Sequence, residues 1–206
     1  VAGPERRIIV VGRVGNGKSV TGNTILGSQV FNSGFSLWSR TEESCQEEET
    51  QLNGGKVVFV DMPGFFPSHC PQDIDAEVSK GVKLCSLGPH IILHVVHPRC
   101  FTENEDMLQQ IKEIFGLQVR NYTILLFACK NILAGESLEN IIPPDENLKG
   151  YFAECGNQYL AFNEVKGVER EAQVAELMTM IDQLVEINSS APCYTEDMMN
   201  FNKQNF

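Results

Sequence analysis

The length and charge of the chain exclude several classes of protein. It has 206 residues, 42% of them hydrophobic, which suits one domain, or one domain with an extension, around a single large core. Acidic residues outnumber basic ones by 27 to 16, and the formal net charge is −11. This charge argues against binding to a nucleic acid backbone or to an anionic membrane surface. An acidic ligand is therefore expected only in a local pocket.

The apolar runs and the cysteines indicate a soluble, cytoplasmic domain. No run reaches the roughly 18 to 20 apolar residues that a membrane-spanning helix needs, so membrane contact is expected only through an anchor outside this sequence. The seven cysteines are an odd number and include no C-x-x-C pair. They argue against both a disulfide framework and a closed zinc site.

Short apolar runs bounded by turn residues predict the strands. Their near-continuous Ile, Val, Leu and Phe content indicates burial on both faces, as in a parallel sheet between helices. A weaker strand over residues 48–52 ends in an Asn-Gly-Gly turn, which would pair it antiparallel with the next strand. The predicted strands cover residues 8–11, 48–52, 57–60, 91–96, 123–127 and 159–162.

Segments of helical period separate these strands. The last of them carries an apolar stripe at i, i+3 and i+4 spacing, from Val174 to Val185, that would face a core. The alternation indicates an α/β fold of three layers, with a mostly parallel sheet of five to six strands and helices on both faces. The predicted helices cover residues 18–26, 73–86, 103–115 and 169–187.

One domain is expected over residues 1–188. Two adjacent prolines, Pro143 and Pro144, interrupt the pattern before the last strand and make residues 134–150 a surface insertion. The polar segment 189–206 is expected to be a C-terminal extension with one short amphipathic helix.

A glycine-rich loop after the first strand carries the strongest chemical signal. Residues 12–19 fit the phosphate-binding pattern G-x-x-x-x-G-K-S, between a strand and a helix as this P-loop motif requires. Lys18 would supply positive charge to the β and γ phosphates, and the Ser19 hydroxyl would coordinate Mg²⁺. The alternative is a glycine-rich turn without a ligand. The backbone N–H groups expected around the phosphates are those of Gly12, Val14, Gly15, Asn16, Gly17, Lys18, Ser19 and Val20.

A second phosphate-site motif, D-x-x-G, runs from Asp61 to Gly64 at the end of the third strand. The Asp61 carboxylate would hold Mg²⁺ through water, and the Gly64 N–H would meet the γ-phosphate. The two motifs together narrow the class toward GTPase-like switches. Phe65 stands where many small GTPases place a Gln that orients the attacking water. Intrinsic hydrolysis should therefore be slow, or completed by another chain, and no catalytic residue is assigned.

Several further segments form a specific pattern beside these motifs: residues 21–27 (TGNTILG), Gly88-Pro89-His90, Arg99, residues 101–105 (FTENE), Phe115-Gly116 and residues 194–198 (YTEDM). With them, the chain resembles the GTPase of immunity-associated protein (GIMAP) family, within the septin and chloroplast import-receptor GTPases. The resemblance covers nearly the whole chain and implies binding of GTP or GDP with Mg²⁺. It also implies homodimers or oligomers formed through the nucleotide-facing surface, and a cytoplasmic location, in some members on the cytosolic face of intracellular membranes.

The first switch loop departs from the family pattern. The family places a Thr three residues before a Cys, but Glu42 occupies that place relative to Cys45. Thr41 is the candidate for the switch hydroxyl that coordinates Mg²⁺ and senses the γ-phosphate. The alternative is a loop Thr with no ligand role.

The base-binding loop departs more sharply. Guanine-binding proteins carry a Lys-x-Asp motif here, whose Asp accepts two hydrogen bonds from guanine, but residues 129–132 read Cys-Lys-Asn-Ile. Ile132 has no acceptor, which should cost about 2 to 4 kcal/mol of guanine affinity and nearly all preference over adenine. Asn131 could offer its amide oxygen if the loop shifts. The base-site candidates are Cys129, Lys130, Asn131 and Asn163, of which Asn163 would meet the base O6 from the last base-side loop.

Three functions are compatible with these residues. The leading hypothesis is a Mg²⁺-dependent switch that binds GTP and GDP, hydrolyses GTP slowly, and self-associates according to its nucleotide state. Ile132 and Phe65 also fit a non-enzymatic scaffold of the same fold that binds nucleotide weakly or not at all. An ATP-using P-loop kinase is disfavoured because no Arg-rich lid is visible in the sequence.

Overall fold

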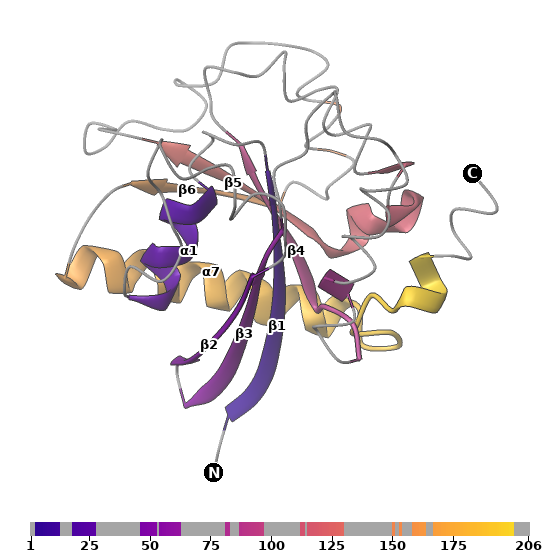
Figure 1. Cartoon of the computed structure of the whole chain (residues 1–206), viewed down its shortest axis with the longest axis horizontal. Coiled ribbons are helices and arrows are strands. Elements are labelled where there is room, and N and C mark those ends of the chain that lie inside the picture. The colour runs from indigo at the N-terminus through magenta and orange to yellow at the C-terminus, as the bar shows by residue number, and fades with distance from the viewer. Residues whose placement is uncertain are drawn as a thin grey trace.

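The described residues form one six-stranded sheet with the order β2-β3-β1-β4-β5-β6 (Figure 1). The strands are β1 (Gly3–Gly12), β2 (Gln46–Leu52), β3 (Gly55–Asp61), β4 (Ile91–Val96), β5 (Thr123–Cys129) and β6 (Tyr159–Asn163). The computed structural model describes residues 3–12, 18–27, 46–52, 54–62, 81–82, 87–96, 112–113, 115–129, 150, 153, 158–163 and 167–199, with the backbone alone at 18–20, 46–48, 117 and 129.

The mostly parallel sheet predicted from the apolar runs is confirmed. β2 runs antiparallel to β3, and the other neighbouring pairs are parallel. The weaker predicted strand is β2, which forms the expected hairpin with Leu52 opposite Gly55. β1 and β2 extend beyond their predicted bounds into polar residues. These polar residues belong to the strands because they pair with β3, as where Arg6 pairs with Val57. Local apolar content does not predict strand positions of this kind.

The described helices agree with the predicted helical periods. α1 (Lys18–Leu26) has the predicted bounds, and α7 (Gly167–Ile187) begins slightly before its predicted start. The 3-10 helix η2 (Leu117–Tyr122), which leads directly into β5, was not predicted. None of the helices in the described part of the chain has the length and apolar character needed to cross a membrane.

Two other predicted helices and the surface insertion fall largely outside the described residues. Within the predicted helices, the described residues 81–82, 112–113 and 115 are helical. Of the predicted insertion, only residue 150 is described. The bounds of these two helices and of the insertion therefore remain sequence predictions.

Apolar layers cover both faces of the sheet, because successive side chains of a buried strand point to opposite faces. Ile8 and Val10 of β1 face the layer that contains α1 and α7, and Ile9 and Val11 face the other. Figure 1 shows α1 and α7 packed side by side. The predicted stripe of α7 is buried there, through Val174, Leu177, Met178, Ile181 and Leu184. Burying each such side chain contributes roughly 1.5 to 3 kcal/mol.

The chain after α7 passes to the opposite face of the sheet. Tyr194 and Met199 are buried in the layer that contains Ile9 and Val11. Residues 196–199 are helical, and the Met198 N–H donates to Thr195 Oγ1 at 3.2 Å, as in an N-cap. The segment after α7 thus contributes to the core.

Tyr194 is held at the amino ends of the strands. Its backbone N–H donates to the Pro89 carbonyl at 2.8 Å, and its hydroxyl donates to the Phe115 carbonyl. Gly88 has a φ of +95°, and a Cβ added to it would lie 2.5 Å from the Tyr194 carbonyl oxygen. Only glycine fits there without movement of the backbone. The Tyr122 ring packs against Tyr194, with ring centroids 5.0 Å apart.

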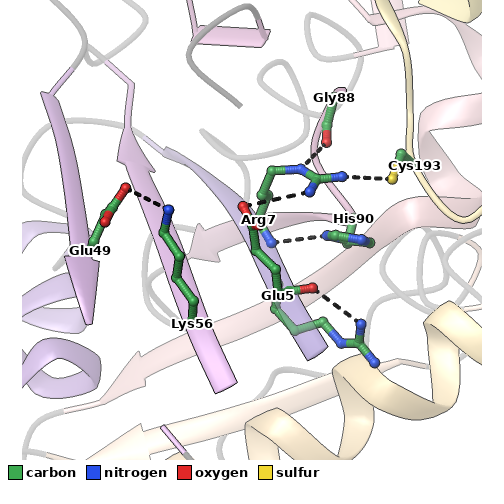
Figure 2. Close-up of polar contacts among 8 residues, drawn as sticks. Glu5, Arg7, Glu49, Lys56, Gly88, His90 and Cys193 are labelled. Carbon is green, nitrogen blue, oxygen red and sulfur yellow. Dashed lines mark hydrogen bonds and ion pairs between the residues drawn. The ribbon is translucent and has the colours of Figure 1, made fainter. Parts of the chain in front are cut away.

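Arg7 ties β1 to the segments before β4 and after α7 (Figure 2). Its guanidinium donates to the Gly88 carbonyl at 2.8 Å and to Cys193 Sγ at 2.9 Å, and the Glu5 carboxylate lies 3.6 Å away. The Arg7 backbone N–H donates to His90 Nδ1 at 2.9 Å, and the His90 backbone N–H donates to the Arg7 carbonyl at 2.8 Å. The buried guanidinium therefore has the hydrogen bonds and counter-charge that a buried cation needs.

Candidate nucleotide-binding site

The carboxyl ends of the parallel strands bring several predicted site residues to one edge of the sheet. β1 ends at Gly12, β3 at Asp61, β5 at Cys129 and β6 at Asn163. In an open α/β sheet, ligands bind at this edge. The strand order makes β3 and β1 neighbours, and likewise β5 and β6. The phosphate-side residues therefore share one part of the edge and the base-side residues another.

The phosphate side consists of the end of β1 and the start of α1. α1 begins at Lys18, and its first turn also includes Ser19 and Val20 without an acidic residue. The first N–H groups of a helix have no partner within the helix, and they carry a partial positive charge. Ile25 is fully buried and fixes α1 on the sheet. The start of α1 beside the end of β1 is therefore suited to an anion, even in this acidic chain.

Asp61 lies at the end of β3, beside β1. It pairs with Val10 in the parallel ladder, and it is 8% exposed. One residue further, the Met62 N–H donates to the Val10 carbonyl at 3.1 Å, which keeps the chain beside β1. A carboxylate is the kind of oxygen donor that Mg²⁺ prefers, so Asp61 is a suitable ligand for a Mg²⁺ ion at this edge.

The base side is formed by the ends of β5 and β6, where Cys129 pairs with Asn163. The Asn163 side-chain Oδ1 is buried and has no hydrogen-bond partner among the described residues. Leaving a buried acceptor unpaired costs about 1 to 3 kcal/mol, which a donor on a bound base would remove. Oδ1 needs an N–H donor, whereas the base O6 is itself an acceptor and would meet Asn163 through Nδ2.

The remaining predicted site residues lie outside the described part of the chain. Their roles stay predictions from the sequence. They are Val14, Gly15, Asn16 and Gly17 of the glycine-rich loop, Thr41, Gly64 and Phe65 of the switch segments, and Lys130, Asn131 and Ile132 of the base loop.

The two histidines that the structure describes lie away from this edge. His90 precedes β4 at its amino end, and His94 is within β4. Burial and the nearby charges of Arg7 and Arg6 lower the pKa of His90 to about 4, and burial lowers the pKa of His94 to about 3. Both side chains are therefore neutral near pH 7. In the described ranges, no three His, Cys, Asp or Glu side chains are grouped so as to hold a metal ion.

Two residues of α7 that support this edge were not singled out from the sequence. Gln173 makes hydrogen bonds to both backbone groups of Asn163, at 2.9 and 3.1 Å. Arg170 donates from Nε to the Thr24 carbonyl of α1 at 2.9 Å. Polar residues beside the apolar stripe of an amphipathic helix are expected anyway. Their type and spacing therefore gave no signal that could have identified these contacts.

The fold and the strand-end arrangement define a P-loop GTPase fold. Toc33 from Arabidopsis thaliana in complex with Mg²⁺ and GMPPNP is similar, with a TM-score of 0.64 and 18% identity over 87% of this chain and 84% of that chain. The G domain of the T. maritima FeoB iron transporter has a TM-score of 0.56 and 14% identity over 87% of this chain and 98% of that chain. At these identities the similarity shows the fold alone.

The chain belongs to the AIG1 family, whose model matches residues 6–206. GTPase IMAP family member 8 of Homo sapiens is 32% identical over 188 residues, which are 89% of this chain but 28% of that protein. Immune-associated nucleotide-binding protein 9 of Arabidopsis thaliana is 31% identical over 205 residues, 96% of this chain and 60% of that protein. The chain thus spans less than two thirds of each relative. The family resemblance predicted from the motifs is confirmed.

Proposed function

We propose that this domain is a Mg²⁺-dependent switch that binds GTP and GDP, hydrolyses GTP slowly and self-associates through its nucleotide-facing surface. The observation that carries the proposal is the placement of Gly12, the start of α1 at Lys18 and the buried Asp61 at one edge of the sheet. Family membership supports it, because the similar proteins include one named as a GTPase and one named as nucleotide-binding.

Each part of the edge has a distinct task in this proposal. The first N–H groups of α1 and the Lys18 ammonium group bind the phosphates, while Ser19, Thr41 and Asp61 hold Mg²⁺. The ion, when bound, neutralises charge that develops on the phosphate oxygens. Phe65 has no polar atom with which to orient a water molecule, so hydrolysis is slow unless another chain supplies that group.

Self-association is proposed from the family resemblance and the similar structures. Dimerization is important for the GTPase activity of the chloroplast translocon components atToc33 and psToc159, whose structure is similar, with a TM-score of 0.67 and 15% identity. A second copy of this chain at the nucleotide face could supply the water-orienting group that Phe65 lacks. The proposed location is the cytoplasm, including the cytosolic face of intracellular membranes if an anchor lies outside this sequence.

Equilibrium binding of labelled GTP, GDP and ATP in the presence of Mg²⁺ tests the proposal. We expect micromolar or tighter binding of GTP and GDP, with selectivity over ATP reduced by Ile132. Lys18→Ala should abolish binding of all three, because it removes the phosphate cation. Lys56→Ala is the matched control, since Lys56 lies at the opposite end of β3 and pairs with Glu49 at 3.0 Å. Its binding should equal that of the wild type.

Two outcomes would contradict the proposal. Undetectable binding of every nucleotide by the wild type would favour the non-enzymatic scaffold, for which Ile132 and Phe65 are the supporting residues. Full binding by Lys18→Ala would show that the phosphate site lies elsewhere. Self-association is measured separately, by sedimentation of the protein with GDP and with GMPPNP, and equal assembly in both would refute its dependence on the nucleotide.

A further inference from the structure

Gln173 contacts β6 at the point where this strand reaches the base side of the site. The Asn163 N–H donates to Gln173 Oε1 at 2.9 Å, and Gln173 Nε2 donates to the Asn163 carbonyl at 3.1 Å. β6 is an edge strand of the described sheet, so its outer backbone groups have no neighbouring strand. The side-chain amide of Gln173 thus occupies the place of a further strand and satisfies both groups of one residue.

Arg170, one turn earlier on the same helix, contacts α1. Residues three apart on a helix lie on the same face, so Arg170 and Gln173 point toward neighbouring elements. Arg170 Nε donates to the Thr24 carbonyl at 2.9 Å, and the Arg170 guanidinium covers Gly27, whose added Cβ would lie 2.5 Å from a guanidinium nitrogen. The positive charge is thus placed at the carboxyl end of α1, where the helix dipole is negative.

One turn of α7 therefore connects the phosphate-binding helix to the last base-side residue. We propose that Gln173 is a positioning residue of the nucleotide site, which holds Asn163 so that its side-chain amide meets the edge of the purine base. This inference rests on the proposed nucleotide binding. Oδ1 of Asn163 is buried without a hydrogen-bond partner in the described part of the chain, so a turn of this side chain toward a bound base would give it one.

The position of Gln173 matters because the usual acceptor is missing. Ile132 stands where guanine-binding proteins have an Asp, so the side-chain amide of Asn163, at the end of β6, gains importance as a polar group that can meet the base. A side-chain amide pairs with either purine if it can turn over, since it carries both a donor and an acceptor. The place from which the Asn163 amide can reach a base depends on its backbone, which the two hydrogen bonds from Gln173 hold.

Gln173→Met tests this role, because Met has a similar length and cannot form either hydrogen bond. We expect the affinity for GDP to fall about tenfold, because the two part-buried hydrogen bonds that hold the Asn163 backbone are lost. Affinity for tripolyphosphate, which has phosphates but no base, should stay unchanged. Amide hydrogen exchange at Asn163 should be faster in the nucleotide-free variant. Gln183→Met is the matched control, since Gln183 is exposed on α7, and it should change none of these measurements.

The outcomes distinguish a failure of the positioning role of Gln173 from a failure of the proposed nucleotide binding. Equal losses of GDP and tripolyphosphate affinity in Gln173→Met would indicate general damage to the fold and overturn the positioning role. Unchanged GDP affinity would overturn it as well. If the wild type binds neither GDP nor tripolyphosphate, the proposed function itself fails, and the role of Gln173 fails with it.

Discussion

Acidification should destabilise this fold through one buried imidazole. His94 has no exposed surface, and burial lowers its pKa from 6.5 to about 3. In the unfolded chain this group takes up a proton as the pH falls below about 6.5, whereas in the folded chain it stays neutral down to about pH 3. The unfolded state therefore binds more protons over this window, and stability falls as the pH falls. At about pH 5 the loss is ~2 kcal/mol, from 1.36 kcal/mol per unit over about 1.5 units.

Urea unfolding of the wild type and His94→Asn at about pH 7 and about pH 5 measures this loss. The variant starts from a lower stability, because a smaller side chain leaves a cavity in the core. The comparison therefore concerns the change between the two pH values. The wild type should lose ~2 kcal/mol more than the variant. His90, whose pKa is also lowered, is present in both proteins and cancels. Equal losses in the two proteins would refute the assignment of this proton uptake to His94.

The contacts of Tyr194 lead to two further predictions. Gly88→Ala should lower the free energy of unfolding by about 1 to 3 kcal/mol more than Gly54→Ala does in urea unfolding. Both glycines have positive φ, but only at Gly88 would a Cβ lie against the Tyr194 backbone. Similar losses in the two variants would contradict this close approach. Tyr194→Phe should lower the free energy of unfolding by about 1 to 2 kcal/mol, since it leaves the Phe115 carbonyl without its hydroxyl donor. An unchanged unfolding midpoint would show that the hydrogen bond from Tyr194 to Phe115 does not stabilise the fold.

The strands were predictable because their residues carry a local signal. β4 and β5 are runs of apolar residues buried on both faces, and this composition by itself distinguishes a central parallel strand from a half-exposed one. The polar half of β1 was not predictable, since Glu5 and Arg6 become part of the strand only through the neighbouring β3. The sequence does not predict η2 for a different reason, because six residues are too few to show a helical period.

The candidate site also contains residues that the sequence identifies and residues that it does not. The glycine-rich loop and Asp61 were identified from the sequence, because phosphate and Mg²⁺ chemistry restricts both the residue types and their spacing. Gln173 was not, since a Gln on an amphipathic helix is compatible with simple exposure to water. Its role depends on the position of α7 against the edge of β6, which no pattern within α7 records.

The sequence by itself determined the class of fold and the family, because each rests on short segments that can be recognised one at a time along the chain. It also contained Gly88-Pro89-His90, Phe115 and Tyr194 as separate pieces of a family pattern. Only the tertiary structure decided that these pieces meet, with Tyr194 hydrogen-bonded to Pro89 and Phe115 and packed on Gly88. The physical reason is that local composition sets strand or helix and burial, whereas a contact between distant residues depends on the path of the whole chain through two layers.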